Sequence, residues 1–457
     1  MNWNTAIFGP RPSVKDMILR VSPNGRYFVD QYGKPFFYLG DTAWTLFNRL
    51  NREDVDIYFK NRVAKGFTVI QAYLLRGLKA KNVYGHTPLI DNDPTKLNEA
   101  YFENVDYVIN RANEMGLVMG LVACWGAHVE ATYGKNVYPE EQIFTRSNAY
   151  TYGRLIGNRY KNNCVIWYLG GDKEPLYNKE EWAAMARGLK DGSENRHLVS
   201  YHGPGQTGKL PSSSIWFHNE EWLDFNVLQT GHAWTVNNYD FITHDYNLKP
   251  VKPVLDMEAS YENHIDVSKK VNRRIDAHQV RESMYWQVLA GAAGHGYGCN
   301  DIWCFWDEKL YLNWDQYGFP SGLKQNTHWK VAMDFPGAIG VGLARKLFES
   351  RPWYKMVPDQ TVIASGQGEG EDHIQAAIAD DGSFILAYLT LGNPVKIYMD
   401  RLTVKKVRAQ WYNPRDGRFI YIGEYPNSGI REFVAPTNYD RDDWVLVLDD
   451  EDRYSNG

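Results

Sequence analysis

The sequence predicts an α/β protein made of a (β/α)8 TIM barrel followed by a small C-terminal antiparallel β-sandwich domain. Two patterns support this prediction: strand-like apolar runs alternate with helical patterns over most of the chain, and short strands separated by Gly, Asp, Asn and Pro turns follow. The length of 457 residues is the third observation. It exceeds one ordinary domain but suits a barrel of about 250 residues or more beside a smaller module.

The barrel is predicted from eight strand candidates, counted from Phe36. They cover residues 35–39, 68–74, 117–124, 164–169, 198–201, 226–229, 253–257 and 294–298. Helical spacing lies between several of them, at residues 52–65, 101–115, 148–160, 180–190 and 273–289. Strand–helix–strand units build parallel sheets, and eight of them favour a closed barrel over an open sheet. Because no Gly-x-Gly-x-x-Gly follows the first strand, a dinucleotide cofactor is not indicated.

The pattern changes after a helical segment at residues 329–348. Short strands are expected at residues 361–364, 374–378, 384–389, 395–398, 407–411 and 444–448, with the spacing of an antiparallel sandwich. Pro352 and Pro358 bracket the change. We therefore expect an N-terminal extension at residues 1–24, a barrel at residues 25–350 and a sandwich at residues 359–457.

The composition narrows the range of partners. A formal net charge of -5 creates no general field that attracts nucleic acid or an anionic membrane, and no apolar run has the length of a membrane helix. We therefore expect neither nucleic acid nor a membrane as a partner, while the oligomeric state stays open. The 16 Trp and 31 Tyr residues favour either aromatic interfaces in a large core or ring faces that stack on sugars.

The termini and the cysteines carry little further signal. Polar and aromatic residues follow Met1, so no signal peptide is predicted there. The protein is expected in the cytoplasm, or in the periplasm or outside the cell if an export signal has been removed. The four Cys residues lie in or beside apolar runs, where a thiol behaves as a small buried hydrophobe. Neither a disulfide framework nor a zinc site is expected.

Two carboxylates directly follow strands, at the end of a barrel where active sites are built. Asp172 follows residues 164–169 through two glycines, and Glu258 follows residues 253–257. Cleavage of a glycosidic bond needs one carboxylic acid to protonate the leaving oxygen and one carboxylate on the opposite face of the sugar. A single Asp after a strand is more often a turn residue or a helix cap, but the pair fits this chemistry.

Other side chains at strand ends are candidates for holding a sugar. His202, Gln229 and His232 follow the fifth and sixth strands and are suitable hydrogen-bond donors to Glu258, although each His taken alone is more often structural. Asp41 either clamps two sugar hydroxyls or caps the helix that follows it. Stacking platforms, or core aromatics, are expected just past the strand ends at Trp44, Tyr73, Trp125, Trp303 and Trp306.

Three segments resemble one known family of barrel glycosidases. Tyr38-Leu-Gly-Asp-Thr-Ala-Trp44, Trp167-Tyr-Leu-Gly-Gly-Asp172 and Val254-Leu-Asp-Met-Glu258 look like the apiosidase-type enzymes of glycoside hydrolase family 140, within the wider clan of retaining (β/α)8 glycosidases. Gln410-Trp-Tyr-Asn-Pro-Arg-Asp-Gly417 resembles the β-sandwich module known as a collagen-binding-type domain. The resemblance implies Asp172 as acid and base, Glu258 as nucleophile, and an apiosyl linkage in a plant-type, pectic polysaccharide side chain as substrate.

Two positions depart from the wider clan. The clan has Asn-Glu after strand four, whereas this chain has Gly171-Asp172, so the acid is one methylene shorter and Glu174 remains a competitor for its role. After strand two, Gln71 stands where the clan often has an Arg beside the nucleophile. Gln71 is a candidate substrate-binding residue, and another group must keep Glu258 ionised.

Two other functions remain open. A metal-dependent hydrolase would need ligands such as the four strand-end histidines His128, His202, His232 and His295. The first strand, however, ends in Gly40-Asp41-Thr42 and lacks the His-x-His of metal-dependent barrel hydrolases, so no metal and no cofactor are expected. A non-catalytic glycan- or matrix-binding protein is the second alternative, motivated by the aromatic content and the tail module. The sequence does not determine the linkage cleaved, or whether the action is exo or endo.

Overall fold

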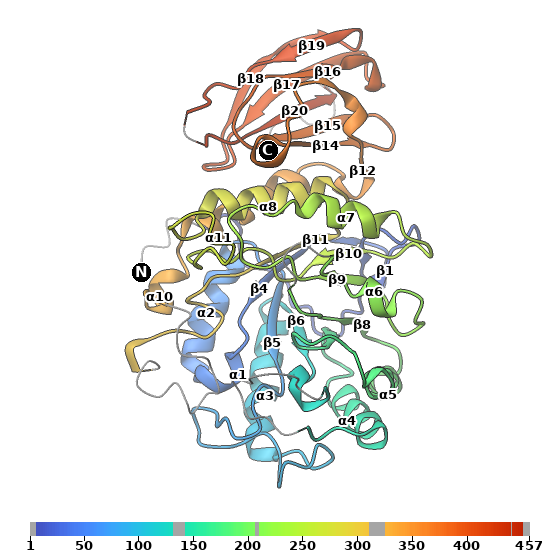
Figure 1. Ribbon diagram of the computed structural model, residues 1–457, viewed down its shortest axis with the longest axis vertical. Coiled ribbons are helices and arrows are strands. Elements are labelled where there is room, and N and C mark those ends of the chain that lie inside the picture. The colour runs from blue at the N-terminus through green and yellow to red at the C-terminus, as the bar shows by residue number, and fades with distance from the viewer. Residues whose placement is uncertain (1–5, 131–141, 206–209, 310–324, 440, 451–457) are drawn as a thin grey trace.

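The structure, a computed structural model, describes residues 6–130, 142–205, 210–309, 325–439 and 441–450. It has a larger part built on parallel strands with helices around them and a smaller antiparallel part at the C-terminal end (Figure 1). Within the described ranges, no helix has both the length and the apolar character needed to cross a membrane.

Among the described residues, eight parallel strands form the centre of the larger part. Six are hydrogen-bonded in the order β11-β4-β5-β6-β7-β8, and β9 pairs in parallel with β10. Their bounds are β4 (Tyr38–Thr42), β5 (Val69–Tyr73), β6 (Val118–Val122), β7 (Val165–Leu169), β8 (Leu198–Tyr201), β9 (Asn226–Leu228), β10 (Val254–Asp256) and β11 (Gly294–Tyr297). This curled parallel sheet, surrounded by helices, confirms the predicted barrel fold.

The first barrel strand differs from its prediction. Residues 35–39 are divided between β3 (Pro35–Phe36), which belongs to a small antiparallel sheet with β1 (Arg20–Val21) and β2 (Phe28–Val29), and the start of β4. Strand β4 continues to Thr42 because β11 and β5 both pair with Asp41. Gly and Asp are disfavoured in strands, so the sequence pattern ends the strand too early.

Helices connect the strands and cover the outside of the sheet. They are α1 (Leu46–Arg49), α2 (Arg52–Ala64), α3 (Glu99–Glu114), α4 (Arg146–Arg159), α5 (Lys179–Gly192), α6 (Ser214–Phe217), α7 (Asn238–Tyr246), α8 (Ala277–Leu289), α10 (Trp329–Ala332) and α11 (Pro336–Glu349). The sequence pattern does not predict α7. Two predicted helices are shorter: Asp276 caps α8 at its first turn, and Pro336 starts α11 anew within residues 329–348.

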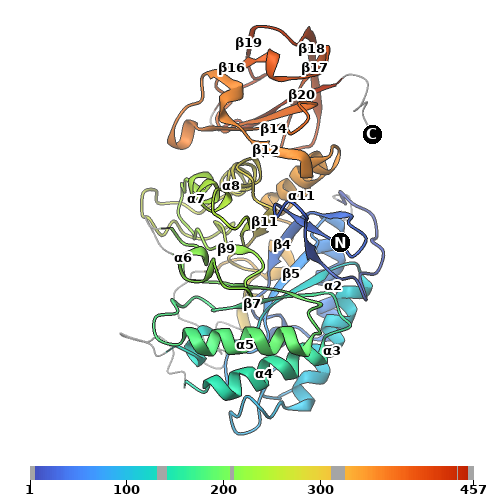
Figure 2. The same ribbon diagram turned by 90° about the vertical axis from the view of Figure 1, so that its right-hand side faces the viewer.

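Two helices approach each other closely on the outer face, where α4 and α5 run side by side (Figure 2). A Cβ on Gly153 of α4 would lie 2.3 Å from the carbonyl oxygen of Met185, and one on Gly188 of α5 would lie 2.2 Å from the carbonyl oxygen of Tyr150. The glycines therefore allow backbone contact that no other residue type permits here.

The barrel strands alternate between two apolar cores. Tyr73 of β5 and Tyr168 of β7 join a cluster inside the barrel, whereas Ile70 and Trp167 join the cluster shared with the helices. Both faces are buried, as is usual for parallel sheets. This alternation decides which polar side chains at the strand ends can reach the site.

The C-terminal part consists of two antiparallel sheets. The larger has the order β12-β14-β15-β20-β17-β18 and the smaller the order β13-β16-β19. The strands are β12 (Met356–Pro358), β13 (Ile363–Ser365), β14 (Ile374–Ala379), β15 (Phe384–Leu389), β16 (Val395–Tyr398), β17 (Lys406–Tyr412), β18 (Phe419–Pro426), β19 (Ile430–Phe433) and β20 (Trp444–Asp450). Ile397 of the smaller sheet packs in one core with Ile385 and Leu446 of the larger, as in the predicted sandwich. Strands β12, β18 and β19 are absent from the sequence prediction.

The sandwich packs against α7 and α8 of the barrel (Figure 1). Arg281 of α8 binds Asp443 through two bonds of 2.7 and 2.9 Å, both side chains being buried. One turn further along α8, the ring of Tyr285 stacks on that of Tyr388 at 4.6 Å. These paired charges and stacked rings fix the position of the sandwich on the barrel.

Candidate active site

Asp172 is held by an unusual turn after β7. Gly170, Gly171 and Asp172 all have positive φ, at 95°, 52° and 60°. A Cβ on Gly170 would lie 2.3 Å from the carbonyl oxygen of His202, and one on Gly171 would lie 2.7 Å from the backbone nitrogen of Gly126. Only Gly fits at these two places, while Asp tolerates the left-handed conformation better than most residues. The turn places the Asp172 carboxyl over the end of the barrel.

One buried imidazole contacts both candidate catalytic carboxylates. His202, directly after β8, has Nδ1 3.3 Å from Oδ1 of Asp172 and Nε2 3.2 Å from Oε2 of Glu258. His232 approaches the other oxygen of Glu258, with 3.4 Å between Nε2 and Oε1. Asp172, Glu258, His202 and His232 are therefore brought together from four different strand ends.

The electrostatics separate the two carboxylates. Partial burial and the negative charge of Glu258 raise the pKa of Asp172 to about 6, against an opposing effect of His202. Burial alone would raise the pKa of Glu258, but His202 and His232 outweigh it and hold that pKa below its usual range. For His202 the effects have the opposite signs. Burial would lower its pKa, but the two carboxylates outweigh burial and raise that pKa. One carboxyl group thus retains its proton more readily than the other, as acid–base catalysis requires.

A buried polar network lies beneath Glu258. Asp256, two residues earlier and fully buried, accepts hydrogen bonds from the Thr230 hydroxyl at 2.5 Å and the Gln287 amide at 2.7 Å. The backbone N–H of Glu258 also points to Asp256, at 3.3 Å, and Gln287 in turn contacts Nδ1 of His295 at 2.7 Å. Burial raises the pKa of Asp256 to about 7.

This network is absent from the sequence prediction. A signal was present, because Asp256 is a second carboxylate at the same strand end, two residues before Glu258. The role of Gln287, on the buried face of α8, has no comparable sequence signal.

Gln71 supports the backbone beside Glu258. Its side-chain NH2 group donates to the Met257 carbonyl oxygen and to the Thr42 hydroxyl, both at 3.0 Å, and its carbonyl oxygen accepts from the Tyr38 hydroxyl at 2.8 Å. The residue is fully buried inside the barrel. Contact between Gln71 and a substrate stays a prediction, and the geometry here shows it positioning the chain next to Glu258.

Asp41 requires a correction. Its carboxylate is fully buried and pairs with Arg62 of α2 at 2.5 Å, and it also accepts a hydrogen bond from Tyr58. Along β4, Asp41 alternates with the inward-facing Tyr38 and Thr42, so its side chain faces the helices and not the barrel interior. It therefore neither clamps a sugar nor caps the following helix. It links a strand to a helix.

Aromatic rings form one side of the site. Trp44 donates from Nε1 to the Tyr261 hydroxyl at 3.0 Å, and its ring lies 4.8 Å from Tyr73 and 5.6 Å from His202. Tyr73 continues the contact to Trp125 at 5.4 Å. Trp303 and Trp306 pack on the same interior cluster, the latter being partly exposed. The structure brings these residues together, while their stacking on a sugar stays a prediction.

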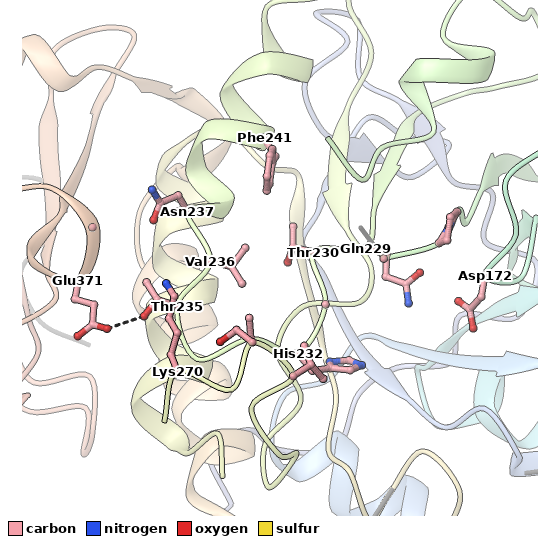
Figure 3. Close-up of a pocket in the computed structure, with 17 residues that line it drawn as sticks. Asp172, Gln229, Thr230, His232, Thr235, Val236, Asn237, Phe241, Lys270 and Glu371 are labelled. Atoms are coloured by element: carbon pink, nitrogen blue, oxygen red, sulfur yellow. Dashed lines mark hydrogen bonds between the residues drawn. The ribbon is translucent and has the colours of Figure 1, made fainter. Parts of the chain in front are cut away.

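A cavity of about 800 Å³ opens beside Asp172. Gln229 and His232 line it, and Gln229 lies between Asp172 and the rest of the cavity (Figure 3). The carbonyl oxygen of the Gln229 side chain is buried without a hydrogen-bond partner among the described residues, so it is available to a ligand. The cavity is within the size range of small-molecule sites, roughly 300–1,000 Å³.

Three side chains of the site, Asp172, His202 and Glu258, also have the donor atoms that a metal ion needs. One atom each from Asp172, His202 and Glu258 lies within 4.8 Å of the others. Two carboxylate oxygens and an imidazole nitrogen suit Zn²⁺ or a similar ion. Two other strand-end histidines are engaged elsewhere: His128 contacts the Arg76 carbonyl oxygen and His295 contacts Gln287.

Two family models and several solved structures match this chain. Residues 22–355 match the model described as "Apiosidase-like, catalytic domain", and residues 357–449 match "Putative collagen-binding domain of a collagenase". A structure titled "Glycoside hydrolase" is 28% identical, covers 97% of this chain and 99% of its own, and superposes with a TM-score of 0.85. A glycoside hydrolase family 5 protein from Bacteroides vulgatus ATCC 8482 is 29% identical, with 98% and 97% covered and a TM-score of 0.87. No curated protein sequence matches the chain.

Proposed function

The chain belongs to the apiosidase-like family and is a glycoside hydrolase, and we propose that it cleaves apiosyl linkages in pectic, plant-type polysaccharide side chains by a retaining mechanism. The observation that carries the mechanism is the contact of Asp172 and Glu258 with opposite nitrogens of His202. The two carboxylates of this arrangement differ in proton affinity, because burial and the charge of Glu258 raise the pKa of Asp172 whereas His202 and His232 together lower that of Glu258.

Glu258 is the proposed nucleophile. The lowered pKa of this group keeps it ionised, and a carboxylate attacks the anomeric carbon only in that form. His202 and His232 take over the role of the clan's Arg, because each places a ring nitrogen against one oxygen of Glu258. The hydrogen-bond network around Asp256 fixes the backbone that carries Glu258.

Asp172 is the proposed acid and base. With a pKa of about 6 it is partly protonated near neutral pH and can protonate the leaving oxygen. Once Glu258 has formed the glycosyl–enzyme bond, its negative charge is lost, and with it one cause of the raised pKa of Asp172. Asp172 then releases its proton more readily and can accept one from the attacking water. Of the two acidic candidates after β7, Asp172 lines the cavity and contacts His202, which favours it over Glu174.

The spacing of the carboxylates supports retention. An oxygen of Asp172 and an oxygen of Glu258 lie within 4.8 Å of each other. Carboxyl groups about 5–5.5 Å apart are typical of retaining glycosidases, whereas about 6.5–9.5 Å leaves room for the water of an inverting reaction. NMR of the first anomer released from a short substrate tests this assignment.

The apiosyl substrate rests on family membership. A product screen on apiose-containing pectic fragments, run beside cello- and xylo-oligosaccharides, tests it. We expect apiose among the products. Release of only glucose or xylose would contradict the apiosyl assignment and leave the glycosidase assignment intact.

A metal-dependent reaction is the second candidate, motivated by the three donor atoms described above. In the proposed mechanism, His202 is a counter-charge to the two carboxylates and no metal takes part, so we expect excess chelator to leave activity unchanged. Loss of activity in chelator, restored by one divalent ion, would favour the metal-dependent reaction.

A further inference from the structure

The cavity beside Asp172 extends to the other domain. Its lining includes Thr235 and Lys270 from barrel loops, and also Gly370 and Glu371 from the sandwich. In Figure 3, Asp172 and Glu371 lie at opposite ends of the labelled row, with His232 and Val236 between them. Its volume of about 800 Å³ lies toward the upper end of the range for small-molecule sites, roughly 300–1,000 Å³.

The cavity lies on the leaving-group side of the site. Asp172 lines it, whereas Glu258 is not among its lining residues. In a two-carboxylate reaction the acid stands beside the glycosidic oxygen, and the leaving sugar continues from that oxygen away from the nucleophile. A saccharide leaving group would therefore extend from Asp172 toward Glu371. This step rests on the proposed function.

The end of the cavity formed by the sandwich is held in place. The Thr235 hydroxyl donates to Oε1 of Glu371 at 2.8 Å, across the two domains. Two residues after Glu371, the ring of His373 stacks on Tyr239 of α7 at 3.8 Å with an interplanar angle of 16°. Together with the Arg281–Asp443 pair, these contacts fix the short segment Gly370–Asp372 against the barrel. Glu371 itself remains exposed, with its carboxylate available to a ligand.

We propose that the sandwich completes a leaving-group subsite, in which Glu371 accepts hydrogen bonds from hydroxyls of a sugar unit beyond the scissile linkage. The ligand class is a saccharide leaving group of two or more units. Lys270, at the same end of the cavity, donates to the ring substituents of that unit. A carboxylate accepts two hydrogen bonds from neighbouring hydroxyls, and charged hydrogen bonds are the stronger ones.

The test compares two substrates with the same glycone. One is 4-nitrophenyl apioside, whose leaving group ends near Asp172, and the other is an apiosylated pectic oligosaccharide with three backbone units. The measured quantity is the ratio of their kcat/KM values, oligosaccharide over aryl glycoside. We expect Glu371→Ala to lower this ratio about tenfold, as for the loss of one charged hydrogen bond. Thr235→Val, which releases Glu371 but keeps the side-chain shape, should lower the ratio in the same direction.

Glu369→Ala is the matched control. Glu369 is an exposed acid two residues away, outside the cavity lining, so its removal should leave the ratio unchanged. An unchanged ratio in Glu371→Ala, including the case in which kcat/KM falls equally on both substrates, would overturn the subsite. If the parent protein cleaves neither substrate, the result contradicts the apiosyl assignment and not the subsite. The same ratio is then measured with 4-nitrophenyl cellobioside or xyloside and the matching oligosaccharide from the product screen.

Discussion

Asp172 and Glu258 contact opposite ring nitrogens of His202, at 3.3 and 3.2 Å. The two titrations are therefore linked through one side chain, and the pair acts as a unit with macroscopic pKa values. Removing the imidazole should change both limbs of the pH profile, which no surface substitution would do.

His202→Gln should lower kcat/KM by about 100-fold, within the range found for acid–base groups. Without the imidazole, the low pKa of Glu258 rises toward its ordinary range, so the acid limb of kcat/KM moves to higher pH. A pH–rate profile measures the shift. His128→Gln, at a strand end away from the carboxylates, should leave the position of that limb unchanged.

The basic limb should belong to Asp172. The proposed mechanism needs this group protonated, so kcat/KM should fall as pH rises through a value near 6, the pKa of Asp172. Asp172→Asn should abolish that limb and reduce turnover of poor leaving groups by about 100-fold or more, while activated aryl leaving groups lose less. A basic limb that persists in Asp172→Asn but disappears in Glu174→Gln would assign the acid to Glu174.

Asp256 should make the folded state less stable as pH rises. Burial raises its folded pKa to about 7, above the ordinary value of an unfolded Asp, so the native state binds more protons between about pH 4 and 7. The free energy of unfolding therefore decreases across this window, by a few kcal/mol at most, roughly 1.4 kcal/mol per pKa unit. Thermal unfolding at several pH values should show a weaker dependence in Asp256→Asn. An identical dependence in both proteins would contradict the raised pKa.

Gly171→Ala should damage the site through the backbone. The residue has a φ of 52°, and its Cβ would lie 2.7 Å from the Gly126 nitrogen, so the turn that carries Asp172 must move. We expect a loss of stability above the about 1–2 kcal/mol of left-handed strain alone, together with a fall in kcat. Gly33→Ala is the control, because Gly33 has a φ of 84° but nothing within 4 Å of the added Cβ. Equal destabilisation of the two variants, measured by chemical denaturation, would mean that the contact with Gly126 is unimportant.

Arg281→Ala should destabilise the domain interface. It leaves the buried Asp443 without its bidentate partner, and breaking a buried pair costs about 3–5 kcal/mol. Arg418→Ala, which removes an exposed partner of Asp416, should cost less than about 1 kcal/mol. Differential scanning calorimetry checks both values, and similar melting temperatures for the two variants would contradict this account.

The barrel was predictable because periodicity alone distinguishes strands from helices. Apolar runs such as 117–124 and 164–169 become β6 and β7 with small changes at their ends. Strand β18 was not predictable, because its residues are largely exposed and include Gly423 and Pro426, which usually mark turns. Its position in the sheet depends on pairing with β17, a contact that local sequence does not encode.

The site was predictable at the level of strand ends, since polar residues there must approach one another in a barrel. The direction of each side chain was not. Asp41 and Gln71 both follow apolar residues near strand ends, yet one faces the helices and the other the interior. A parallel strand buried on both faces has apolar residues at every position, so its sequence does not reveal which side faces inward.

The left-handed turn at Gly170, Gly171 and Asp172 also limits how this sequence can diverge. The Asn-Glu of the wider clan differs from Gly171-Asp172 at both positions, and the first of the two changes is hindered because any side chain at position 171 meets Gly126. A longer acid at position 172 would meet the same φ of 60° and would hold its carboxyl one methylene farther from the backbone. The short acid, the two glycines and the loop at Gly126 therefore form a set of residues that must be inherited together or replaced together.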